Sequence, residues 1–302
     1  MKYDKLSWSQ MVRDAEEKKQ GLFEYLRDRA AAQMECTPEQ VMEKMSAMLT
    51  VMEEAVDFGL TGVRSNSGLT GGSAKKMREM LEERQKGEQP TLLGPVASDA
   101  VVFSLATAEC NAAMGRIVAA PTAGASGVLP GMLLALRKHY GLSRETVLEG
   151  LLVAGMIGEV IANRASISGA SGGCQAECGS GAAMAAGAAV HMLGGDGKQI
   201  DAAISIVFKD MLGLVCDPVA GLVEVPCIKR NAGSVMQALL AAEMSLADIG
   251  SFIPADEAID AMKLVGNCMS SSLRETAGGG MAATPTAREW ARNYFAAGQK
   301  KD

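Results

Sequence analysis

Apolar side chains recur every three or four residues along most of this chain, which is the spacing of one face of an α-helix. The pattern is clearest over 41–56, where valine, methionine and leucine repeat at this interval. Just before it, Thr37 is a capping residue, Pro38 suits the first helical position, and Gln40 completes a capping box. These signals predict a helix that begins after Thr37 and ends near Gly59.

Helix formers dominate the whole chain, and the alternation of β-branched residues that is typical of strands is scarce. Ser73 begins a charged helix, Ser143 can cap a long apolar helix, and Thr286 with Glu289 forms another capping box. We predict helices over 9–32, 38–59, 73–86, 97–118, 127–140, 144–163, 177–193, 198–214, 232–246 and 256–273, with one more near the C-terminus. The expected fold is all-α, and we expect a single helical domain over 1–302.

The segments between these helices are rich in glycine and small polar residues. Four of them stand out, namely 65–72, 121–127, 166–173 and 277–280. Several run directly into predicted helix starts, where backbone N–H groups are free to bind an anion such as a carboxylate. Each segment alone is explained by a turn, but four in one helical chain indicate that some converge on a site.

Composition narrows the function classes. The 302 residues contain 29 basic and 35 acidic side chains, a net charge of −6, which argues against a nucleic-acid-binding surface. No apolar run is long and uninterrupted enough for a membrane span. The first 30 residues include Asp4, Asp14, Glu16 and Glu17, which do not fit a secretory signal. We therefore expect a cytoplasmic protein without a membrane or nucleic-acid partner.

The chain has seven cysteines, at positions Cys36, Cys110, Cys174, Cys178, Cys216, Cys227 and Cys268. An odd number without an export signal favours reduced thiols over a disulfide framework. Four of the seven fall within 174–227. The other three lie in ordinary helical contexts, where cysteine is a common small buried residue.

Common zinc sites combine two pairs of ligands, each spaced C-x2-4-C, and the four clustered cysteines contain no such pair of pairs. Cys174 follows two glycines at a predicted helix start, where a thiol pKa is lowered. Cys178 would share a helix face with it. Cys216 and Cys227 lie next to or near prolines in predicted turns. A metal or cluster site and a set of buried thiols explain this pattern equally well.

Five segments of the chain form distinctive motifs, namely SGLTGG (67–72), PTAGASGVLPG (121–131), SGASGGCQAE (168–177), CDPVAGLVEVPCIKRNAG (216–233) and LRETAGGGMAATPTAR (273–288). These motifs resemble those of the iron–sulfur-dependent L-serine dehydratases. The resemblance covers nearly the whole chain and is closest to the separate alpha subunit of the two-subunit form. Segments of this length in the same order are highly specific.

The resemblance implies that Cys174, Cys216 and Cys227 bind a 4Fe-4S cluster with one iron left open. Such an iron would act as a Lewis acid on the substrate hydroxyl, so that L-serine is deaminated to pyruvate and ammonia, a step of amino-acid catabolism that can supply gluconeogenesis. Cys178 departs from the family pattern; as a fourth ligand it would close the cluster and suit it to electron transfer. Single-chain relatives can cap the open iron with a C-terminal cysteine, which the ending 298–302 lacks.

The resemblance also suggests where the substrate binds. Ser67, Thr70, Gly71 and Gly72 are expected to hold its carboxylate, with Thr122, Gly124, Ser126 and Ser168 as weaker candidates in the same pocket; turn formation is the plainer explanation of each residue alone. No catalytic base is evident: His139 and His191 are interpreted as surface or packing residues, and Glu177 as an ordinary helix-terminal acid. The family implies a beta subunit that supplies the missing catalytic group.

Three alternatives stay open at this point. A related cluster-dependent enzyme that degrades L-cysteine would use similar motifs, and substrate preference among serine, threonine and cysteine is not determined. A non-catalytic cluster protein would explain the cysteines but not the glycine loops. A pyridoxal-phosphate lyase could use Lys75 or Lys76 after the glycines at 71–72, but such enzymes have an α/β pattern that is absent here.

Overall fold

Helix α9 (Ser180–Met192) lies in the centre of the fold, and every residue of it except His191 is buried. Its sequence consists almost entirely of alanine, glycine and other small residues, so neighbouring helices can approach its backbone closely. Helices α6 (Val128–Tyr140), α7 (Arg144–Arg164), α10 (Gly197–Met211) and α11 (Cys227–Leu246) pack around it. The core of the protein is therefore built around a helix that contributes little side-chain area itself.

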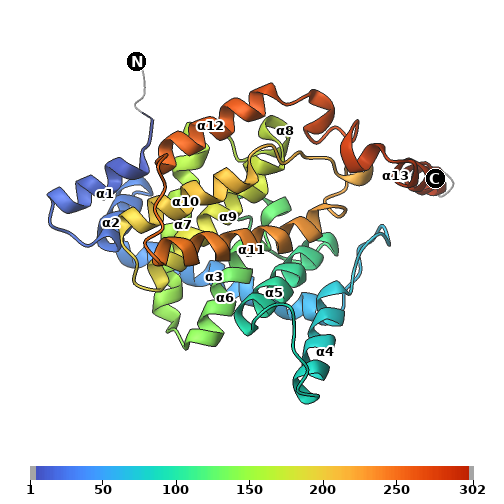
Figure 1. Ribbon diagram of the computed structural model, residues 1–302, viewed down its shortest axis with the longest axis horizontal. Helices are drawn as coiled ribbons and strands as arrows, with labels where there is room; N and C mark the ends of the chain where they lie inside the picture. The colour runs from blue at the N-terminus through green and yellow to red at the C-terminus, as the bar shows by residue number, and fades with distance from the viewer. Residues whose placement is uncertain (1–4, 299–302) are drawn as a thin grey trace.

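The computed structural model describes residues 5–298, shown in Figure 1. The remaining longer helices are α1 (Trp8–Glu17), α2 (Leu22–Gln33), α3 (Pro38–Leu60), α4 (Ser73–Lys86), α5 (Pro95–Ala112), α12 (Ala255–Cys268) and α13 (Pro285–Gly298). The short helical turns are η1 (Ala123–Ala125), α8 (Gly169–Gly172), the π-helical turn η2 (Gln175–Gly179), η3 (Val219–Gly221), η4 (Ser271–Leu273) and η5 (Gly280–Ala283). Extended pairing in this part of the chain is limited to two isolated bridges, which confirms the all-α fold.

The N-terminal helix predicted over 9–32 is wrong, because the chain forms two helices there. Lys19 adopts a left-handed conformation with φ of 53°, which ends α1, and Gly21 is the N-cap of α2. The apolar pattern continues across the break because both helices pack on the same core, so the periodicity does not reveal the turn.

The helix predicted over 97–118 is also too long, since α5 ends at Ala112. Met114 takes the left-handed conformation with φ of 62°, and the N–H of Gly115 donates to the carbonyl of Cys110 at 2.8 Å. The N–H of Met114 donates to the carbonyl of Asn111 at 3.0 Å, which completes a Schellman ending. The sequence hides this ending because the left-handed residue is a methionine rather than a glycine.

The caps of α3 and α7 are confirmed, since Thr37 and Ser143 accept hydrogen bonds from the first-turn backbone. The predicted capping box of Thr286 is wrong. Thr286 lies inside α13, and Thr284 accepts from the N–H of Ala287 at 3.4 Å instead. Pro285 explains the shift, because proline is favoured at the first position of a helix.

Two further helix boundaries differ from the prediction near the cysteines. Helix α11 begins at Cys227 rather than near 232, so this cysteine lies in the first turn of a helix and not in a loop. The segment predicted as helix over 256–273 ends at Cys268.

Among residues 5–298, no helix is long and apolar enough to cross a membrane. The C-terminal residues 299–302, which bear on the predicted lack of a capping cysteine, lie outside the described residues.

Candidate active site

Cys174, Cys216 and Cys227 come from three separate elements that meet beside the N-terminus of α9. Cys174 lies between α8 and the π-helical turn η2. Cys216 lies in an extended segment and forms a parallel bridge with Arg274. Cys227 is the first residue of α11. Each cysteine therefore lies at a helix terminus or between helices, where the backbone conformation can vary to orient the thiol.

The three thiols are shielded from solvent and influence one another. Cys174 and Cys216 are each 3% exposed, and Cys227 is half-buried. Burial, together with the charges of Glu177 and Cys174, raises the pKa of Cys216 well above its usual value. Burial and the charge of Cys174 raise the pKa of Cys227 to about 12. Deprotonated thiols at this place therefore need a positively charged partner.

Cys178 is buried directly behind Cys174, one helical turn further along the chain. Interaction with the Cys178 thiol lowers the pKa of Cys174, and the same interaction raises that of Cys178. The expectation that these two cysteines share a face is thus correct. The two thiols therefore lie in direct contact.

The carboxylate of Glu177 lies among these thiols. It accepts a hydrogen bond from Thr122 Oγ1 at 2.8 Å and is 3.9 Å from Cys216 Sγ. Gly124 and Gly169 border it so closely that a Cβ on Gly169 would lie 2.8 Å from Cys216 Sγ and 2.9 Å from Glu177 Oε2. Burial raises the pKa of Glu177. The interpretation of this residue as an ordinary helix-terminal acid is therefore wrong.

Residues 121–127, here called the inner loop, are fixed to the start of α11. Asn231 donates to the carbonyls of Gly124 at 2.7 Å and Cys227 at 2.9 Å, and accepts from the N–H of Gly127 at 2.9 Å. Ser126 is 1% exposed, and its hydroxyl has no hydrogen-bond partner among the described residues. One asparagine thus locks the inner loop to a cysteine-bearing helix.

Residues 65–72, here called the outer loop, are fixed to the segment between Cys216 and Cys227. Ser67 Oγ donates to Glu224 Oε1 at 2.8 Å, and Thr70 Oγ1 donates to Glu224 Oε2 at 2.7 Å. Glu224 is 7% exposed. The hydroxyls expected to bind a substrate carboxylate therefore bind a carboxylate of the chain itself.

Gly71 and Gly72 end the outer loop and lead into α4. Both have positive φ, and Gly72 is the N-cap of this helix. The N–H groups of Ser73 and Ala74 donate to the buried carboxylate of Glu109 at 2.7 and 3.2 Å. The first N–H groups of α4 are thus already paired, which removes the phosphate cradle that a pyridoxal-phosphate enzyme would need beside Lys75.

Asp217, the residue after Cys216, binds both Arg230 of α11 and the C-terminal motif. Asp217 accepts from Arg230 Nη1 and from the N–H of Met281, at 2.7 and 2.6 Å. Arg230 Nη1 also donates to the carbonyl of Val215 at 2.7 Å. Gly280 has φ of 57° and faces Asp217 so closely that any side chain there would collide with it. Gly280 therefore serves close packing beside Asp217, the neighbour of Cys216.

Ser168 lies at the N-terminal side of α8, immediately before Gly169, and is half-buried. Its backbone N–H donates to Ser166 Oγ at 3.1 Å. Of the eight predicted substrate residues, Ser67, Thr70 and Thr122 are joined to carboxylates of the chain, the first two to Glu224 and the third to Glu177.

A sequence comparison identifies the family. The family described as "Serine dehydratase alpha chain" matches residues 4–282. The chain belongs to the serine dehydratase alpha chain family. This membership confirms the resemblance drawn from its motifs, and a dehydratase breaks a carbon–oxygen bond, so the enzyme class is that of the carbon–oxygen lyases.

Individual relatives agree with this membership. The chain is 52% identical over 261 residues to the "Probable L-serine dehydratase, alpha chain" of Bacillus subtilis, covering 86% of this chain and 85% of that protein. It is 42% identical over 263 residues to the "L-serine dehydratase, alpha chain" of Peptoniphilus asaccharolyticus, covering 87% and 88%. The "L-serine dehydratase" of Streptomyces coelicolor is 38% identical over 252 residues, which make up 81% of this chain and 53% of that protein.

The two histidines of this serine dehydratase family member pair with acids away from the cysteines. His139 Nε2 lies 2.6 Å from Asp99 Oδ2, and His191 Nε2 lies 3.3 Å from Glu149 Oε2. Their interpretation as surface or packing residues agrees with these contacts.

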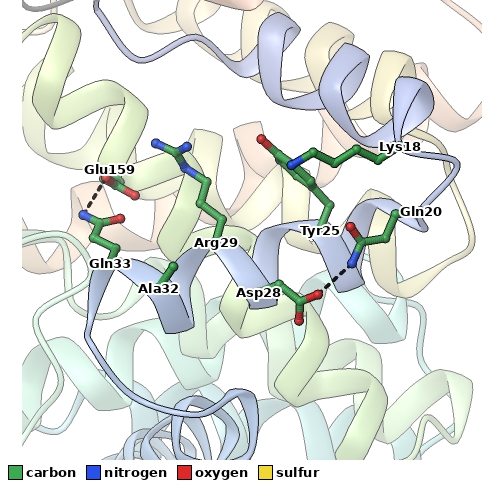
Figure 2. Close-up of a pocket in the computed structure, with 8 residues that line it drawn as sticks. All are labelled: Lys18, Gln20, Tyr25, Asp28, Arg29, Ala32, Gln33 and Glu159. Atoms are coloured by element: carbon green, nitrogen blue, oxygen red, sulfur yellow. Dashed lines mark hydrogen bonds between the residues drawn. The ribbon is translucent and has the colours of Figure 1, made fainter.

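A cavity of about 640 Å³ lies elsewhere on the protein, between α7 and the segment formed by α2 and the turn before it. Figure 2 shows its lining, in which Gln20 and Gln33 bind Asp28 and Glu159. No cysteine lines it. The volume of a cavity therefore does not locate the active site of this enzyme.

Sequence reasoning missed the residues that hold the site together. They are Glu109, Glu177, Asp217, Glu224, Arg230 and Asn231. A usable signal existed for Glu177 and Glu224, because each is an isolated acid three residues from a cysteine in a segment of otherwise small or apolar residues. A buried charge is rarely retained without partners, so such acids indicate a polar network.

Proposed function

We propose that this chain is the alpha subunit of an L-serine dehydratase, which converts L-serine to pyruvate and ammonia with a 4Fe-4S cluster bound by Cys174, Cys216 and Cys227. The observation that carries the proposal is that two buried thiols, Cys174 and Cys216, and the half-buried Cys227 come together beside the inner loop. The relatives named L-serine dehydratase alpha chain support the substrate and the reaction.

The chemistry of the proposed ligands fits an iron–sulfur cluster. Thiolates are the usual ligands of such clusters. Among residues 5–298, no three histidine, cysteine or acidic side chains lie close enough together to hold one metal ion. A cluster is larger than one ion and can be reached by thiols that surround it from separate elements. The positive charge of Arg230 adds to the Cys178 interaction that lowers the pKa of Cys174, and it partly offsets the burial that raises the pKa of Cys227.

When bound, a cluster with three protein ligands supplies a Lewis-acidic iron for the departing hydroxyl group of serine. The chain itself supplies the walls of this site. Gly124 and Gly169 pack so closely against Glu177 and Cys216 that neither position has room for a side chain. Shielding from solvent strengthens every charge interaction within the site.

The outer loop is proposed to bind the substrate carboxylate. The hydroxyls of Ser67 and Thr70 already donate to Glu224, so the backbone of Gly71 and Gly72 is the better source of donors. Glycine permits this, because no side chain prevents a ligand from approaching its N–H. Thr122, Gly124, Ser126 and Ser168 are proposed to line the other side of the pocket, next to Glu177.

The proton at Cα of the substrate is proposed to be removed by a group of a beta subunit, since neither histidine of this chain lies at the cysteines. The name "alpha chain" of the relatives implies a further subunit. Elimination of water from serine gives aminoacrylate, which tautomerises and is hydrolysed to pyruvate and ammonia. We propose a single catalytic domain over 1–302 and a cytoplasmic location, which keeps the seven thiols reduced.

The proposal is tested by anaerobic purification of the chain together with its beta subunit. We expect a brown protein with about four iron and four sulfide per alpha chain, pyruvate formation from L-serine, and loss of activity in air. A colourless, iron-free protein with air-stable serine turnover would overturn the cluster. Faster turnover of L-cysteine than of L-serine or L-threonine would identify the cysteine-degrading alternative.

A further inference from the structure

The carboxylate of Glu224 joins the outer loop to the segment that carries two of the cysteines. It lies three residues before Cys227 in the sequence, but its hydroxyl donors Ser67 and Thr70 are 157 and 154 residues away. Ser67 Oγ also accepts from the N–H of Leu69 at 3.0 Å, so this hydroxyl both donates and accepts. The loop and the cysteine segment therefore meet through one buried acid.

Two roles for this arrangement can be compared. In the first, a substrate carboxylate displaces Glu224 from the hydroxyls of Ser67 and Thr70. Displacement would leave the carboxylate of Glu224, which is 7% exposed, without these hydrogen-bond donors. The free-energy cost of leaving this carboxylate unpaired is larger than the gain from the hydrogen bonds that the substrate would form with the same hydroxyls. In the second role, Glu224 stays in place and holds the loop in the shape that receives the substrate. The energetics favour the second role.

We propose that Glu224 is a positioning residue that sets the affinity for substrate by fixing the outer loop against the Cys216–Cys227 segment. The inference rests on the proposed function for its substrate, L-serine. Ser67 and Thr70 then act through Glu224 and the loop backbone rather than by touching the substrate. The opposite end of the loop is held separately, by the bonds from Ser73 and Ala74 to Glu109.

The test compares Glu224→Ala and Glu224→Gln with the unaltered chain, each assembled with the beta subunit. We expect Glu224→Ala to raise KM for L-serine about tenfold or more, with kcat within about threefold and the iron content unchanged. Glu224→Gln should recover part of the affinity, because its amide oxygen still accepts one hydroxyl. Ser67→Ala with Thr70→Val should match Glu224→Ala, and adding Glu224→Ala to that pair should change KM little.

Hydrogen exchange of the amides in 65–72 provides a readout that does not depend on serine turnover. Glu224→Ala should speed this exchange without affecting the inner loop. The control is Asp256→Asn, which removes another buried carboxylate that accepts from a serine hydroxyl, Ser7 Oγ at 2.6 Å. It should lower stability but leave KM and the outer-loop exchange unchanged.

Three results of the kinetic and iron measurements would overturn the positioning role. They are an unchanged KM in Glu224→Ala, a fall in kcat alone, or a loss of iron. Unchanged exchange in 65–72 would do the same. Absence of serine turnover in the unaltered enzyme would instead refute the proposed function, and the exchange experiment would still decide whether Glu224 fixes the loop.

Discussion

The inner and outer loops are both rich in glycine and small polar residues but are attached to the protein in different ways. Residues 124–127 of the inner loop are buried, and Asn231 binds its backbone directly to the start of α11. The outer loop is mostly exposed or half-buried, and side-chain hydroxyls tie it to Glu224. Each loop thus reaches a carboxylate three residues from a cysteine, but only the inner one lies against the thiols.

This difference separates two functions within one site. A loop packed against Glu177 and Cys216 cannot move without disturbing the thiols. The outer loop is more exposed and is held by a few side-chain hydroxyl groups. It can therefore shift without moving the cysteines. Changes near the inner loop should therefore affect cluster binding, and changes in the outer loop should affect substrate affinity.

The largest effect is expected from the cysteines that both loops surround. Cys216→Ser should lose iron and reduce serine turnover by at least about 100-fold, because a ligand is replaced by a weaker donor. Iron analysis and a pyruvate assay measure both. Cys36→Ser is the control, since this half-buried cysteine lies between α2 and α3 and should retain full activity. Equal iron content in the two variants would show that the ligand set is wrong.

The next effect tests the inner side of the site. Gly169→Ala places a Cβ 2.8 Å from Cys216 Sγ, so we expect about a tenfold loss of bound iron from the cost of overpacking. Gly155→Ala is the matched control, because its Cβ in α7 meets nothing within 4 Å. It should raise stability by about 0.5–1 kcal/mol, measured as a higher Tm. Full iron loading of Gly169→Ala would contradict the close packing.

A smaller effect is expected in the outer loop. Gly71→Ala places a Cβ 2.5 Å from the carbonyl oxygen of Val63, so the loop must shift and KM should rise several-fold while iron is retained. Gly68→Ala also places a side chain on a residue with positive φ, 73° compared with 138° at Gly71, but its Cβ has open space around it. Comparing the two KM values separates displacement of the loop from backbone strain. Loss of iron in Gly71→Ala would remove the distinction between the loops.

The smallest effect is expected from the fourth cysteine. Cys178→Ala should keep iron content and turnover within about twofold, and lower stability by about 1 kcal/mol for the lost buried sulfur. Iron analysis and thermal unfolding test this. An iron-free Cys178→Ala protein would show that Cys178 is a fourth ligand, so that the cluster has no open iron.

Much of the fold follows from local patterns in the sequence. The caps at Thr37 and Ser143 and the long apolar periodicities predict α3 and α7 correctly, because capping and burial depend on neighbouring residues. The break after Glu17 and the ending of α5 were missed, since left-handed lysine and methionine carry no local signal. The family was also determined by the sequence, through ordered motifs around the cysteines.

The tertiary structure alone decided how the site is assembled. Thr122 and Glu177 are 55 residues apart, and Ser67 and Glu224 are 157 apart, so no local pattern pairs them. The sequence indicated hydroxyl-rich loops, and it could not indicate that their hydroxyls would be bound by acids of the same chain. Such pairs form only when distant segments pack, because a buried carboxylate must take its donors from whichever loops the fold brings to it.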